Sequence, residues 1–524
     1  MNNSKKTKPK PTSVRIFSAA VVGLNAFPVE VEADASPGLH SFNIVGLTDK
    51  AVDESKDRIG SAIKNSGFTP PIKKNRRIVI NLAPADIKKG GSLYDLPIAL
   101  GYLLATSQIK FDASETVFLG ELSLDGSVKK INGVLPIVQM VVKNGFKRVV
   151  LPTENSNEAS LVSGIDVISI KNISEAVGYL HGEINLIPHE NIKYNDFIGN
   201  NDDAEDFIDI SQIKGQESAK RALVISAAGN HNILMSGPPG GGKTLLSKAL
   251  SGILPAMDYD EALEITKIYS VAGMLSANSP IVTTRPFRSP HHTTSSVAVI
   301  GGGTSPRPGE ITLAHRGVLF LDEVPEFPRS VLESLRQPLE NGVVVVSRAS
   351  GTAKFPARFL LVAAMNPCPC GNFGDDKLVC VCNANSINKY HKKMSGPLLD
   401  RIDIQINVSR ETYDKMTGPS TGQNSTEIRQ IVEKARTIQK ARFLGSKTLT
   451  NSEMGIKEIE THCKLPKDAE ELIKSAFVTH NISGRGYHKI LKIARTIADL
   501  DESNQIQVPH IAEAIGYRIV KNEL

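Results

Sequence analysis

Gly237-Pro238-Pro239-Gly240-Gly241-Gly242-Lys243-Thr244 lies between an apolar run, Ile233-Leu234-Met235, and a pattern of helical spacing that begins at Leu245. Strand, glycine-rich turn and helix in this order are the context of a P-loop, whose backbone N–H groups surround the phosphates of a nucleotide. The N-terminus of the helix adds the positive end of its dipole. The sequence therefore predicts that the chain binds ATP, with Lys243 at the β- and γ-phosphates and the Thr244 hydroxyl as a ligand of Mg²⁺.

Two further apolar runs end in polar residues that suit a hydrolytic site. The run 317–321 ends at Asp322 and Glu323, and the run 359–365 ends at Asn366. Continuous apolar runs are typical of strands buried on both faces of a parallel sheet, whose C-terminal ends hold ligands. We expect Asp322 to join the Mg²⁺ shell, Glu323 to orient and deprotonate the attacking water, and Asn366 to fix that water. The structural alternative is three core strands with polar ends.

Composition narrows the classes of partner. The chain has 524 residues, enough for about three domains of roughly 150 residues each. Its 61 basic and 55 acidic residues give a net charge of +6, which permits an anionic partner without requiring one. The absence of Trp and the low aromatic content argue against base stacking as the main mode of nucleic-acid binding. No apolar run approaches about 18 residues, so we expect no membrane span, and an ATP-dependent enzyme belongs in the cytoplasm.

The hydrophobic pattern changes along the chain. Arg77 to Leu82 predicts a strand early in the chain, and Ile16 to Phe27 predicts the first strand. Near the C-terminus, Ile490, Leu491, Ala494, Ile497 and Ala498 form one helical stripe. The expected segments are a disordered basic tail (1–12), an α+β domain (13–186), an acidic linker (187–210), an α/β nucleotide-binding domain (211–408) and a helical bundle (425–524).

With these motifs the chain resembles an AAA+ ATPase, and more narrowly the magnesium-chelatase-like group with its ComM/YifB branch. The resemblance covers almost the whole chain and is carried by the P-loop together with residues 213–216, 285–292, 317–323, 365–371, 397–403 and 484–488. It implies an α/β fold with an AAA+ P-loop domain, a C-terminal helical lid and an N-terminal α+β domain of the Lon-protease (S5-like) type. Such ATPases work as rings, usually hexamers, and the ComM branch is associated with DNA branch migration during natural transformation.

The resemblance also implies roles for individual residues. Gln216 matches the motif that contacts the nucleotide. Arg401 matches the arginine finger, which reaches the γ-phosphate of a neighbouring subunit and stabilises charge on its equatorial oxygens. Arg485 matches the second sensor, which contacts the γ-phosphate in its own chain. The structural alternative for Arg401 is an ion pair with Asp400 or Asp403.

Two inserts offer cationic side chains to a substrate. Residues 341–359 have a hairpin pattern around Gly351, and in related motors such a hairpin faces the central pore, where Arg348 and Lys354 suit a phosphate backbone. The second insert, about 271–314, contains Arg285 and Arg288, which we expect to contact nucleic acid, and adjacent histidines that favour a loop contact over a metal site. The alternative for both inserts is a solvated hairpin.

Four of the five cysteines form two close pairs. Cys368, Cys370, Cys380 and Cys382 give two CxC knuckles in a zinc-ribbon-like insert, residues 368–382. Four thiolates satisfy tetrahedral Zn²⁺, and in a cytosolic protein metal is favoured over disulfide. We predict a structural zinc that tethers the loop after Asn366, with no part in the chemistry.

The N-terminal domain raises proteolysis as a rival function. Ser92 falls where the nucleophile of a Lon-type Ser–Lys dyad belongs, but Leu135 occupies the position of the lysine. Lys129 and Lys130 belong to the preceding turn and are out of register. A serine hydroxyl without its base is a poor nucleophile, so we expect a scaffold or binding module.

Together these observations predict a cytoplasmic, Mg²⁺-dependent ring ATPase that translocates on or remodels DNA, most plainly a branch-migration helicase. The expected partners are branched or single-stranded DNA, other copies of the chain in a homo-hexamer, and recombination proteins. The alternative is a chelatase-like remodelling ATPase that acts on a protein partner. A role in binding alone is disfavoured by the presence of Lys243, Asp322, Glu323 and Arg401.

Overall fold

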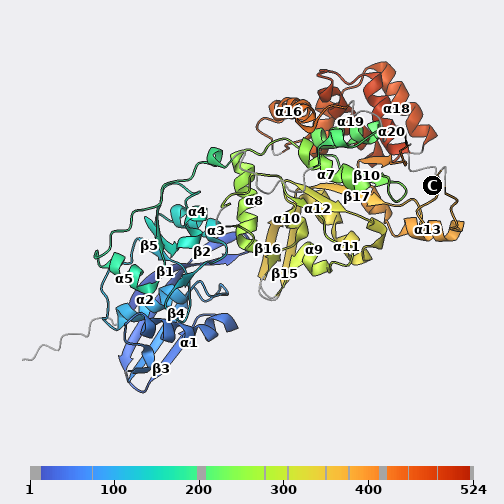
Figure 1. Cartoon of the computed structure of the whole chain (residues 1–524). Helices are drawn as coiled ribbons and strands as arrows, with labels where there is room; N and C mark the ends of the chain where they lie inside the picture. Colours follow the sequence, from blue (N-terminus) through green and yellow to red (C-terminus); the bar gives the residue numbers. More distant parts are fainter. Residues whose placement is uncertain are drawn as a thin grey trace, which may run out of the picture.

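The computed structural model describes residues 13–73, 75–197, 208–276, 279–303, 306–348, 351–375, 378–411, 413, 422–446, 448–480 and 482–519. The predicted basic tail, 1–12, and residues 198–207 of the predicted linker lie outside these ranges. Figure 1 shows an N-terminal body in blue and cyan, a central body in green and yellow, and C-terminal helices in orange and red above it. Within the described ranges, no helix combines the length and apolar character needed to cross a membrane.

The N-terminal body is built on a mixed seven-stranded sheet in the order β3-β4-β2-β1-β5-β8-β9. The segment from Ile16 to Phe27, predicted as one strand, instead contains parts of two antiparallel strands joined by a turn at Gly23 and Leu24, where Gly23 has a φ of +62°. The strands are β1 (Val14–Val22), β2 (Asn25–Pro37), β3 (Ser41–Val45), β4 (Arg76–Ala83), β5 (Thr116–Phe118), β6 (Glu121–Leu122), β7 (Val128–Lys129), β8 (Arg148–Pro152) and β9 (Asp166–Ile170). The helices are α1 (Lys50–Asn65), α2 (Asp95–Ala105), α3 (Val134–Lys143), α4 (Ser156–Ala159) and α5 (Ile173–Leu180), with 3₁₀ turns η1 (Pro71–Lys73), η2 (Thr153–Asn155) and η3 (Tyr194–Asp196).

The central body contains a parallel five-stranded sheet in the order β11-β14-β17-β10-β18. Every residue of β10, β14 and β17 is buried, so the prediction of strands covered on both faces is confirmed. The strands are β10 (Ile233–Ser236), β11 (Phe287–Arg288), β14 (Val318–Leu321), β17 (Leu360–Met365) and β18 (Ile404–Asn407); β12 (Gly301–Gly302) pairs with β13 (Arg307–Pro308), and β15 (Val343–Arg348) pairs with β16 (Gly351–Pro356). The helices are α6 (Glu217–Gly229), α7 (Lys243–Ile253), α8 (Tyr259–Ala272), α9 (Ser296–Ile300), α10 (Glu310–Leu313), α11 (Arg329–Ser334), α12 (Arg336–Asn341), α13 (Ala384–Lys392) and α14 (Gly396–Leu399), with η5 (Ile210–Gln212) and η6 (Val324–Glu326).

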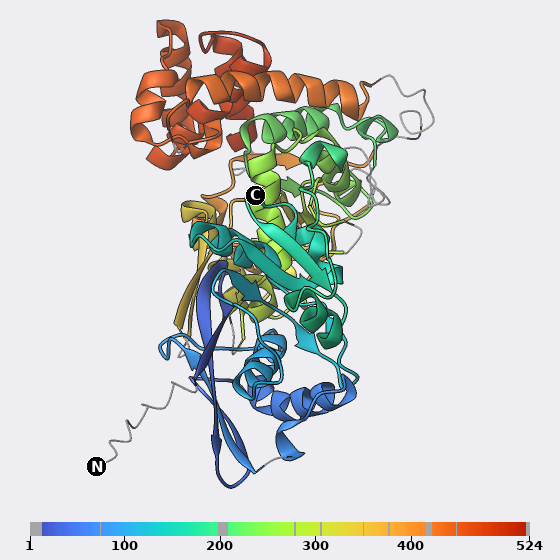
Figure 2. The ribbon, with the colours of Figure 1, turned by 90° about the vertical axis from the view of Figure 1, so that its left-hand side faces the viewer.

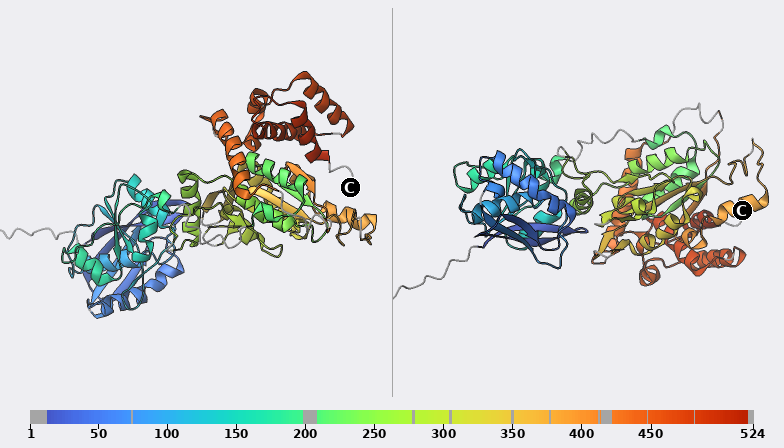
Figure 3. Two further views of the ribbon diagram at one scale, coloured as in Figure 1. Left: turned by 45° about the horizontal axis from the view of Figure 1, so that its top comes forward. Right: turned by 90° about the horizontal axis from the view of Figure 1, so that it is seen from below.

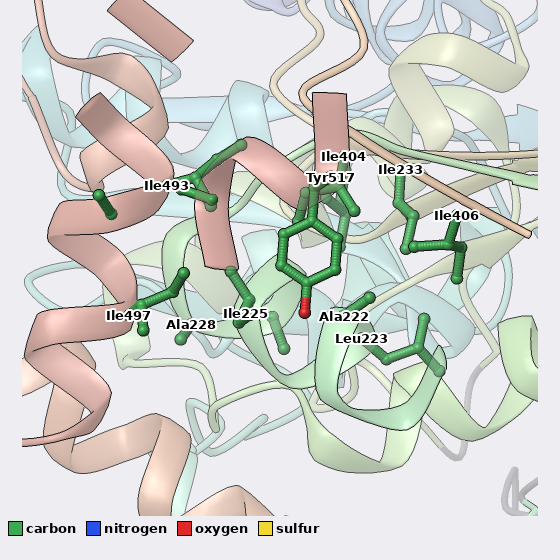
Figure 4. Packing of buried hydrophobic residues seen from close by; sticks show 14 of the residues in the cluster. Ala222, Leu223, Ile225, Ala228, Ile233, Ile404, Ile406, Ile493, Ile497 and Tyr517 are labelled. Carbon is green, nitrogen blue, oxygen red and sulfur yellow. The ribbon is translucent and has the colours of Figure 1, made fainter. Parts of the chain in front are cut away.

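The C-terminal helices pack on one face of this sheet and form a common core with it. They are α16 (Ser425–Arg442), α17 (Ile456–His462), α18 (Lys467–Thr479), α19 (Gly484–Leu500) and α20 (Val508–Ile519), with η7 (Asn451–Glu453). Figure 4 shows Ile493 and Ile497 of α19 and Tyr517 of α20 beside residues of α6, β10 and β18. The predicted apolar stripe of α19 is therefore buried against helix α6, which covers that face of the sheet.

The N-terminal body docks on α8 of the central body, as the turned views in Figures 2 and 3 also show. Leu135 is fully buried in an apolar cluster with Ala262 and Ile265 of that helix. Beside it, the Ser270 hydroxyl donates to the buried Glu158 carboxylate, whose pKa is raised by burial. The position of the missing protease lysine is thus occupied by an apolar side chain of the interdomain core.

A second contact joins the N-terminal body to the β15–β16 hairpin. Gly23, in the β1–β2 turn, lies so close to Ala353 of β16 that a Cβ at Gly23 would be 3.2 Å from the Ala353 side chain. The neighbouring Leu24 packs against the apolar cluster that includes Val344 and Phe355 of the hairpin. The predicted substrate hairpin is therefore supported on one side by the N-terminal body.

Candidate functional site

The predicted P-loop follows β10 and leads into α7, as the sequence indicates. Gly237 has to be glycine, because a Cβ there would lie 2.0 Å from the Val408 carbonyl oxygen. Gly242, with φ of +86°, is the N-cap of α7 and leaves the first N–H groups of the helix open to an anion. Pro238, Pro239, Gly240 and Gly241 complete the turn between these two glycines.

Lys243 is directed into this turn. Its Nζ donates to the carbonyl oxygens of Gly237 (2.6 Å) and Pro238 (3.0 Å) and to Oδ1 of Asn366 (3.1 Å). Burial lowers the pKa of Lys243, and the nearby carboxylates of Asp322 and Glu323 oppose that shift. The ammonium group is thus held where it can exchange carbonyl oxygens for phosphate oxygens.

The side chains predicted to serve Mg²⁺ and the attacking water meet at the ends of α7 and β14. The Thr244 hydroxyl donates to Oδ2 of Asp322 at 3.1 Å, so the two predicted metal ligands are neighbours. Hydroxyl and carboxylate oxygens are the hard ligands that Mg²⁺ prefers, and this pair fits the ion. Glu323 has a left-handed backbone, with φ of +50°, and its Oε2 lies 3.6 Å from Nδ1 of His292.

Gln216 lies beside the P-loop and at the start of α6. Its Nε2 donates to the Ser409 carbonyl oxygen at 2.6 Å, and its backbone N–H donates to the Glu411 carboxylate at 2.7 Å. The residue has φ of +57°. These contacts fix the backbone that borders the predicted nucleotide pocket.

The predicted arginine finger lies at the opposite edge of the same sheet. Because β10 and β18 are parallel, the P-loop follows the C-terminal end of β10, whereas Arg401 precedes the N-terminal end of β18. The strands β10 and β18 have four residues each, so their N-terminal and C-terminal ends are about 13 Å apart. Arg401 pairs with Glu340 and donates to the Pro397 carbonyl oxygen at 2.8 Å. The hydrogen bond from Arg401 lowers the pKa of the Glu340 carboxyl group.

Arg485 shares a cleft of about 510 Å³ with Arg401, and no P-loop residue lines this cleft. One turn further along α19, Lys489 donates to the Ile402 carbonyl oxygen at 3.1 Å and pairs with Asp403 at 2.8 Å. This placement does not bring Arg485 to the P-loop of its own chain, and the predicted contact with the γ-phosphate in the same chain stays a prediction. The reason is that α19 meets the sheet at the edge away from the P-loop.

Sequence reasoning missed the charged groups that hold this cleft together. Burial raises the pKa of the Asp403 carboxyl group, but Lys489 and His231 lower it by more. The net result is a pKa below the ordinary value. The suggested ion pair between Arg401 and Asp403 is therefore replaced by Arg401–Glu340 and Asp403–Lys489 pairs. The spacing of four residues between Arg485 and Lys489 on one helix face was an available signal, whereas nothing in the sequence pointed to Glu340.

Arg285 and Arg288, predicted to contact nucleic acid, are both occupied within the chain. Arg285 pairs with Glu261 at 2.7 Å and donates to the Pro255 carbonyl oxygen at 2.7 Å. Arg288 makes a two-pronged contact with Glu310 at 2.7 and 2.8 Å. These contacts anchor the insert on α8 and α10, so neither guanidinium group is presented to a phosphate backbone.

The other two predicted contacts, Arg348 and Lys354, belong to the β15–β16 hairpin. Arg348 is the last residue of β15 and is paired in register with Gly351. Lys354 is exposed on β16, while Phe355 beside it is buried. The alternation gives the hairpin one face in the core and one face in solvent.

The four predicted zinc ligands come together. The Sγ atoms of Cys368, Cys370, Cys380 and Cys382 all lie within 4.8 Å of one another. The Sγ of Cys368 is 3.3 Å from that of Cys370 and 3.7 Å from that of Cys380. Tetrahedral Zn–S bonds of about 2.3 Å place sulfurs roughly 3.8 Å apart, so the cluster fits zinc. Backbone N–H groups, that of Asn372 first, lower the pKa of Cys370 to about 6.

This cysteine loop lies directly on the P-loop. A Cβ at Gly371 would be 2.6 Å from Cδ of Pro239, and the loop begins two residues after Asn366. His391 of α13 lies 2.9 Å from the Pro367 carbonyl oxygen and holds the loop from its other side. The cysteine cluster therefore supports the residues that would surround the γ-phosphate.

Among the described residues, the Ser92 hydroxyl is hydrogen-bonded to a carboxylate and not to a lysine. Ser92 Oγ donates to the Glu121 carboxylate, and Leu135 is buried against α8. Lys130 donates to the Leu275 carbonyl oxygen at 2.5 Å, and Lys129 pairs in register with Glu121 across β6 and β7. A carboxylate acceptor does not generate the alkoxide in the way that a neutral lysine does, and the scaffold or binding role stays a prediction.

Comparison with known proteins agrees with this architecture. Three family models match consecutive parts of the chain: subunit ChlI of Mg-chelatase (31–155), magnesium chelatase subunit ChlI (209–416) and the ChlI C-terminal region (422–518). The chain is 42% identical over 511 residues to the competence protein ComM of Haemophilus influenzae, which covers 96% of this chain and 97% of that protein. It is 38% identical over 511 residues to the uncharacterized protein YifB of Escherichia coli, with 96% and 97% covered. A shorter match, 27% identical over 176 residues, is to Lon protease 2 of Bacillus subtilis, with 30% and 31% covered.

The contact between the two loops predicts different effects for two glycine variants. Gly371→Ala should weaken ATP binding by about tenfold, or ~1.4 kcal/mol, because its Cβ would displace Pro239. Gly374→Ala is the control: its φ of +74° is close to the +83° of Gly371, yet a Cβ there meets nothing within 4 Å. Titration with a fluorescent ATP analogue measures both affinities. Equal losses in the two variants would show that the cysteine loop does not constrain the P-loop.

Proposed function

The chain belongs to the ComM/YifB family of magnesium-chelatase-like AAA+ ATPases, and from this membership we propose that it is a ring-forming motor that translocates on or remodels DNA. One observation supports the ring: the P-loop lies at one edge of the central sheet, and Arg401 and Arg485 lie at the opposite edge. A single chain then holds two half-sites. A second copy, placed with its Arg401 edge against the P-loop edge, completes a site, and repetition of that contact closes a ring.

At the P-loop edge, we propose that each side chain acts on a different part of the reaction. Lys243 binds the β- and γ-phosphates, and Thr244 and Asp322 hold Mg²⁺, which supplies charge neutralisation between the phosphates. Glu323 accepts the proton of the attacking water, and Asn366, already bonded to Lys243, orients that water. The glycines of the P-loop offer N–H groups to the phosphate oxygens, and Gln216 steadies the border of the pocket.

At the other edge, we propose that Arg401 and Arg485 both serve the neighbouring subunit. A guanidinium delivered in trans stabilises the charge that spreads over the γ-phosphate oxygens in the transition state. Before assembly, Arg401 is held by Glu340 and would exchange that carboxylate for phosphate. Hydrolysis then depends on contact between subunits, as is needed for sequential firing around a ring.

DNA is the proposed substrate, and the β15–β16 hairpin is the proposed contact. Its exposed Lys354 and the terminal Arg348 suit a phosphate backbone, and the near-full-length relative named a competence protein favours DNA over other polymers. More specifically, we propose that the protein drives branch migration and that recombination proteins are its partners. The family models name a chelatase subunit, so remodelling of a protein partner is the second candidate function.

ATPase measurements with DNA separate these two functions. We expect a four-way DNA junction to stimulate turnover severalfold. The stimulation should fall steeply from 50 to 200 mM salt, because the release of counterions from DNA is less favourable at higher salt. A Lys354→Ala variant tests the hairpin. If the hairpin is a substrate contact alone, this variant should bind the junction more weakly but keep its turnover without DNA. A ring whose turnover does not respond to DNA at either salt would favour the protein-remodelling function.

Mixing of variants tests the shared site. Arg401→Ala and Arg485→Ala should each bind ATP and lose most hydrolysis, because the missing cation acts on the neighbour. Each variant mixed with Lys243→Ala should regain part of the activity, since some interfaces then combine an intact P-loop with intact arginines. If Arg485→Ala behaves differently, and mixed rings confirmed by native mass spectrometry show no recovery, Arg485 acts within its own chain.

The proposed role of zinc is structural. Removal of the metal would free the loop between Asn366 and α13 and so loosen the support of Pro239. Elemental analysis of the purified chain should give one zinc per chain, and the Cys370→Ser/Cys382→Ser variant should lose it with a lower Tm. A metal-free wild-type protein of normal stability would contradict this assignment.

A further inference from the structure

A second cleft, of about 410 Å³, lies between the segment after Glu323 and helix α13. One wall is formed by η6 and the first residue of α11, and it carries Glu326, Phe327 and Arg329. The other wall is formed by α13 and the residue that follows it, with Lys389, Lys392 and Lys393. Figure 1 shows α13 at the end of the central body that is remote from the N-terminal body. We call this cleft the basic groove.

The charges of the basic groove are unbalanced. Four cationic side chains, all exposed, line it together with one carboxylate, Glu326. That carboxylate is paired with Lys393 at 3.2 Å. Among the described residues, no carboxylate lies within 4.0 Å of the charged atoms of Arg329, Lys389 or Lys392, although Glu333, one turn further along α11, is close enough for Arg329 to help lower its pKa. The groove therefore presents three cations toward a ligand.

Helix capping accounts for only part of this pattern. Lys389 and Lys392 lie in the last turn of α13, where cations interact favourably with the helix dipole. Arg329, however, is the first residue of α11, where a cation is unfavourable for the same reason. Glu333, one turn further along α11, offsets part of this cost, and three cations gathered around one cleft still favour an anionic ligand.

We propose that the basic groove binds the phosphodiester backbone of DNA, as a second contact besides the β15–β16 hairpin. The assignment rests on the proposed DNA function. Lysines at i and i+3 stand about 5–6 Å apart on one helix face, and flexible ammonium groups bind phosphates without regard to base sequence. A motor that acts on branched DNA of any sequence needs this kind of contact.

The groove also touches the proposed catalytic base. Phe327 lies at the edge of the His292 ring, with centroids 6.4 Å apart, and His292 lies 3.6 Å from Glu323. Only Val324 and Pro325 separate Glu323 from Glu326 in the chain. A DNA backbone that draws Lys393 away from Glu326 would thus act on the segment that directly follows Glu323. Because the groove and Glu323 are so close, DNA bound in the groove would change the rate of ATP hydrolysis.

Binding of a fluorescent four-way junction to the full-length protein tests the groove. Lys389→Ala/Lys392→Ala should lower the affinity at least tenfold and reduce the slope of log K against log salt concentration by about 2, for two lost phosphate contacts. Arg329→Ala alone should reduce that slope by about 1. The matched control is Lys467→Ala/Lys474→Ala, two exposed lysines of α18 on the helical lid, which should match the wild type.

Three results would overturn the proposal in distinguishable ways. Unchanged affinity and slope in the double variant, with a wild type that binds the junction, would remove the groove and leave the DNA function intact. Loss of the ring in native mass spectrometry, with unchanged DNA contacts per chain, would make the groove a subunit contact. A wild type that does not bind the junction at all would remove the DNA function and the groove together.

Discussion

Asn232, at the start of β10, ties three strands of the central sheet together at one edge. Its side chain donates to the Arg401 carbonyl oxygen at 3.1 Å and accepts from the Leu361 N–H at 2.9 Å, and its N–H donates to Asp403 at 3.2 Å. With the parallel pairing of β10 to β17 and β18, these bonds fix the place of Arg401 relative to the P-loop. Because the strands are parallel, the phosphate-binding turn and Arg401 lie at opposite ends of them. Under the proposed function, a second copy of the chain supplies the arginines that complete the site.

The face of the N-terminal body that contains Leu135 packs against α8. Burying Glu158 under α8 is costly unless its oxygens are bonded, and they accept from the Ser270 hydroxyl and, at 2.9 Å, from the Leu135 N–H. Leu135 fills the adjoining space with apolar contacts to Ala262 and Ile265. A lysine at that position would bring a polar amine into this apolar cluster, so the packing on α8 favours the leucine found there.

Local sequence patterns predicted the parts of the site that depend on neighbours in the chain. The P-loop needs glycines at fixed places, the buried strands need unbroken apolar runs, and the cysteine cluster needs two short knuckles joined by one loop. Each of these is determined within about fifteen residues, a range over which backbone geometry limits the outcome. Lys243, Thr244, Asp322 and Asn366 are far apart in the sequence, and they were predicted together because parallel buried strands bring their C-terminal ends to the same edge of the sheet.

Tertiary charge pairing was not predictable in the same way. Arg285 and Arg288 look available in the sequence, but their partners Glu261 and Glu310 lie more than twenty residues away and are brought near only by the folded insert. The position of Arg485 depends on how α19 meets the sheet, which Lys489 and Asp403 fix through one buried pair. The sequence identified Arg285, Arg288 and Arg485 as candidate functional residues, and only the fold shows which group each one contacts.

Under the proposed function, one segment of the chain connects the nucleotide site with the contact to DNA. Lys243 already donates to Asn366, so a γ-phosphate that takes over Lys243 must also change the bond at Asn366. Asn366 leads directly into the cysteine loop, and that loop leads into α13, whose His391 contacts the Pro367 carbonyl oxygen. Under the proposed function, α13 also carries Lys389 and Lys392 of the basic groove. Binding linkage is reciprocal, so a phosphate that shifts α13 through this segment changes DNA affinity by the same factor by which DNA changes ATP affinity. The four cysteines lie in the middle of that segment, and a metal that stiffens them would transmit the shift where a flexible loop would absorb it.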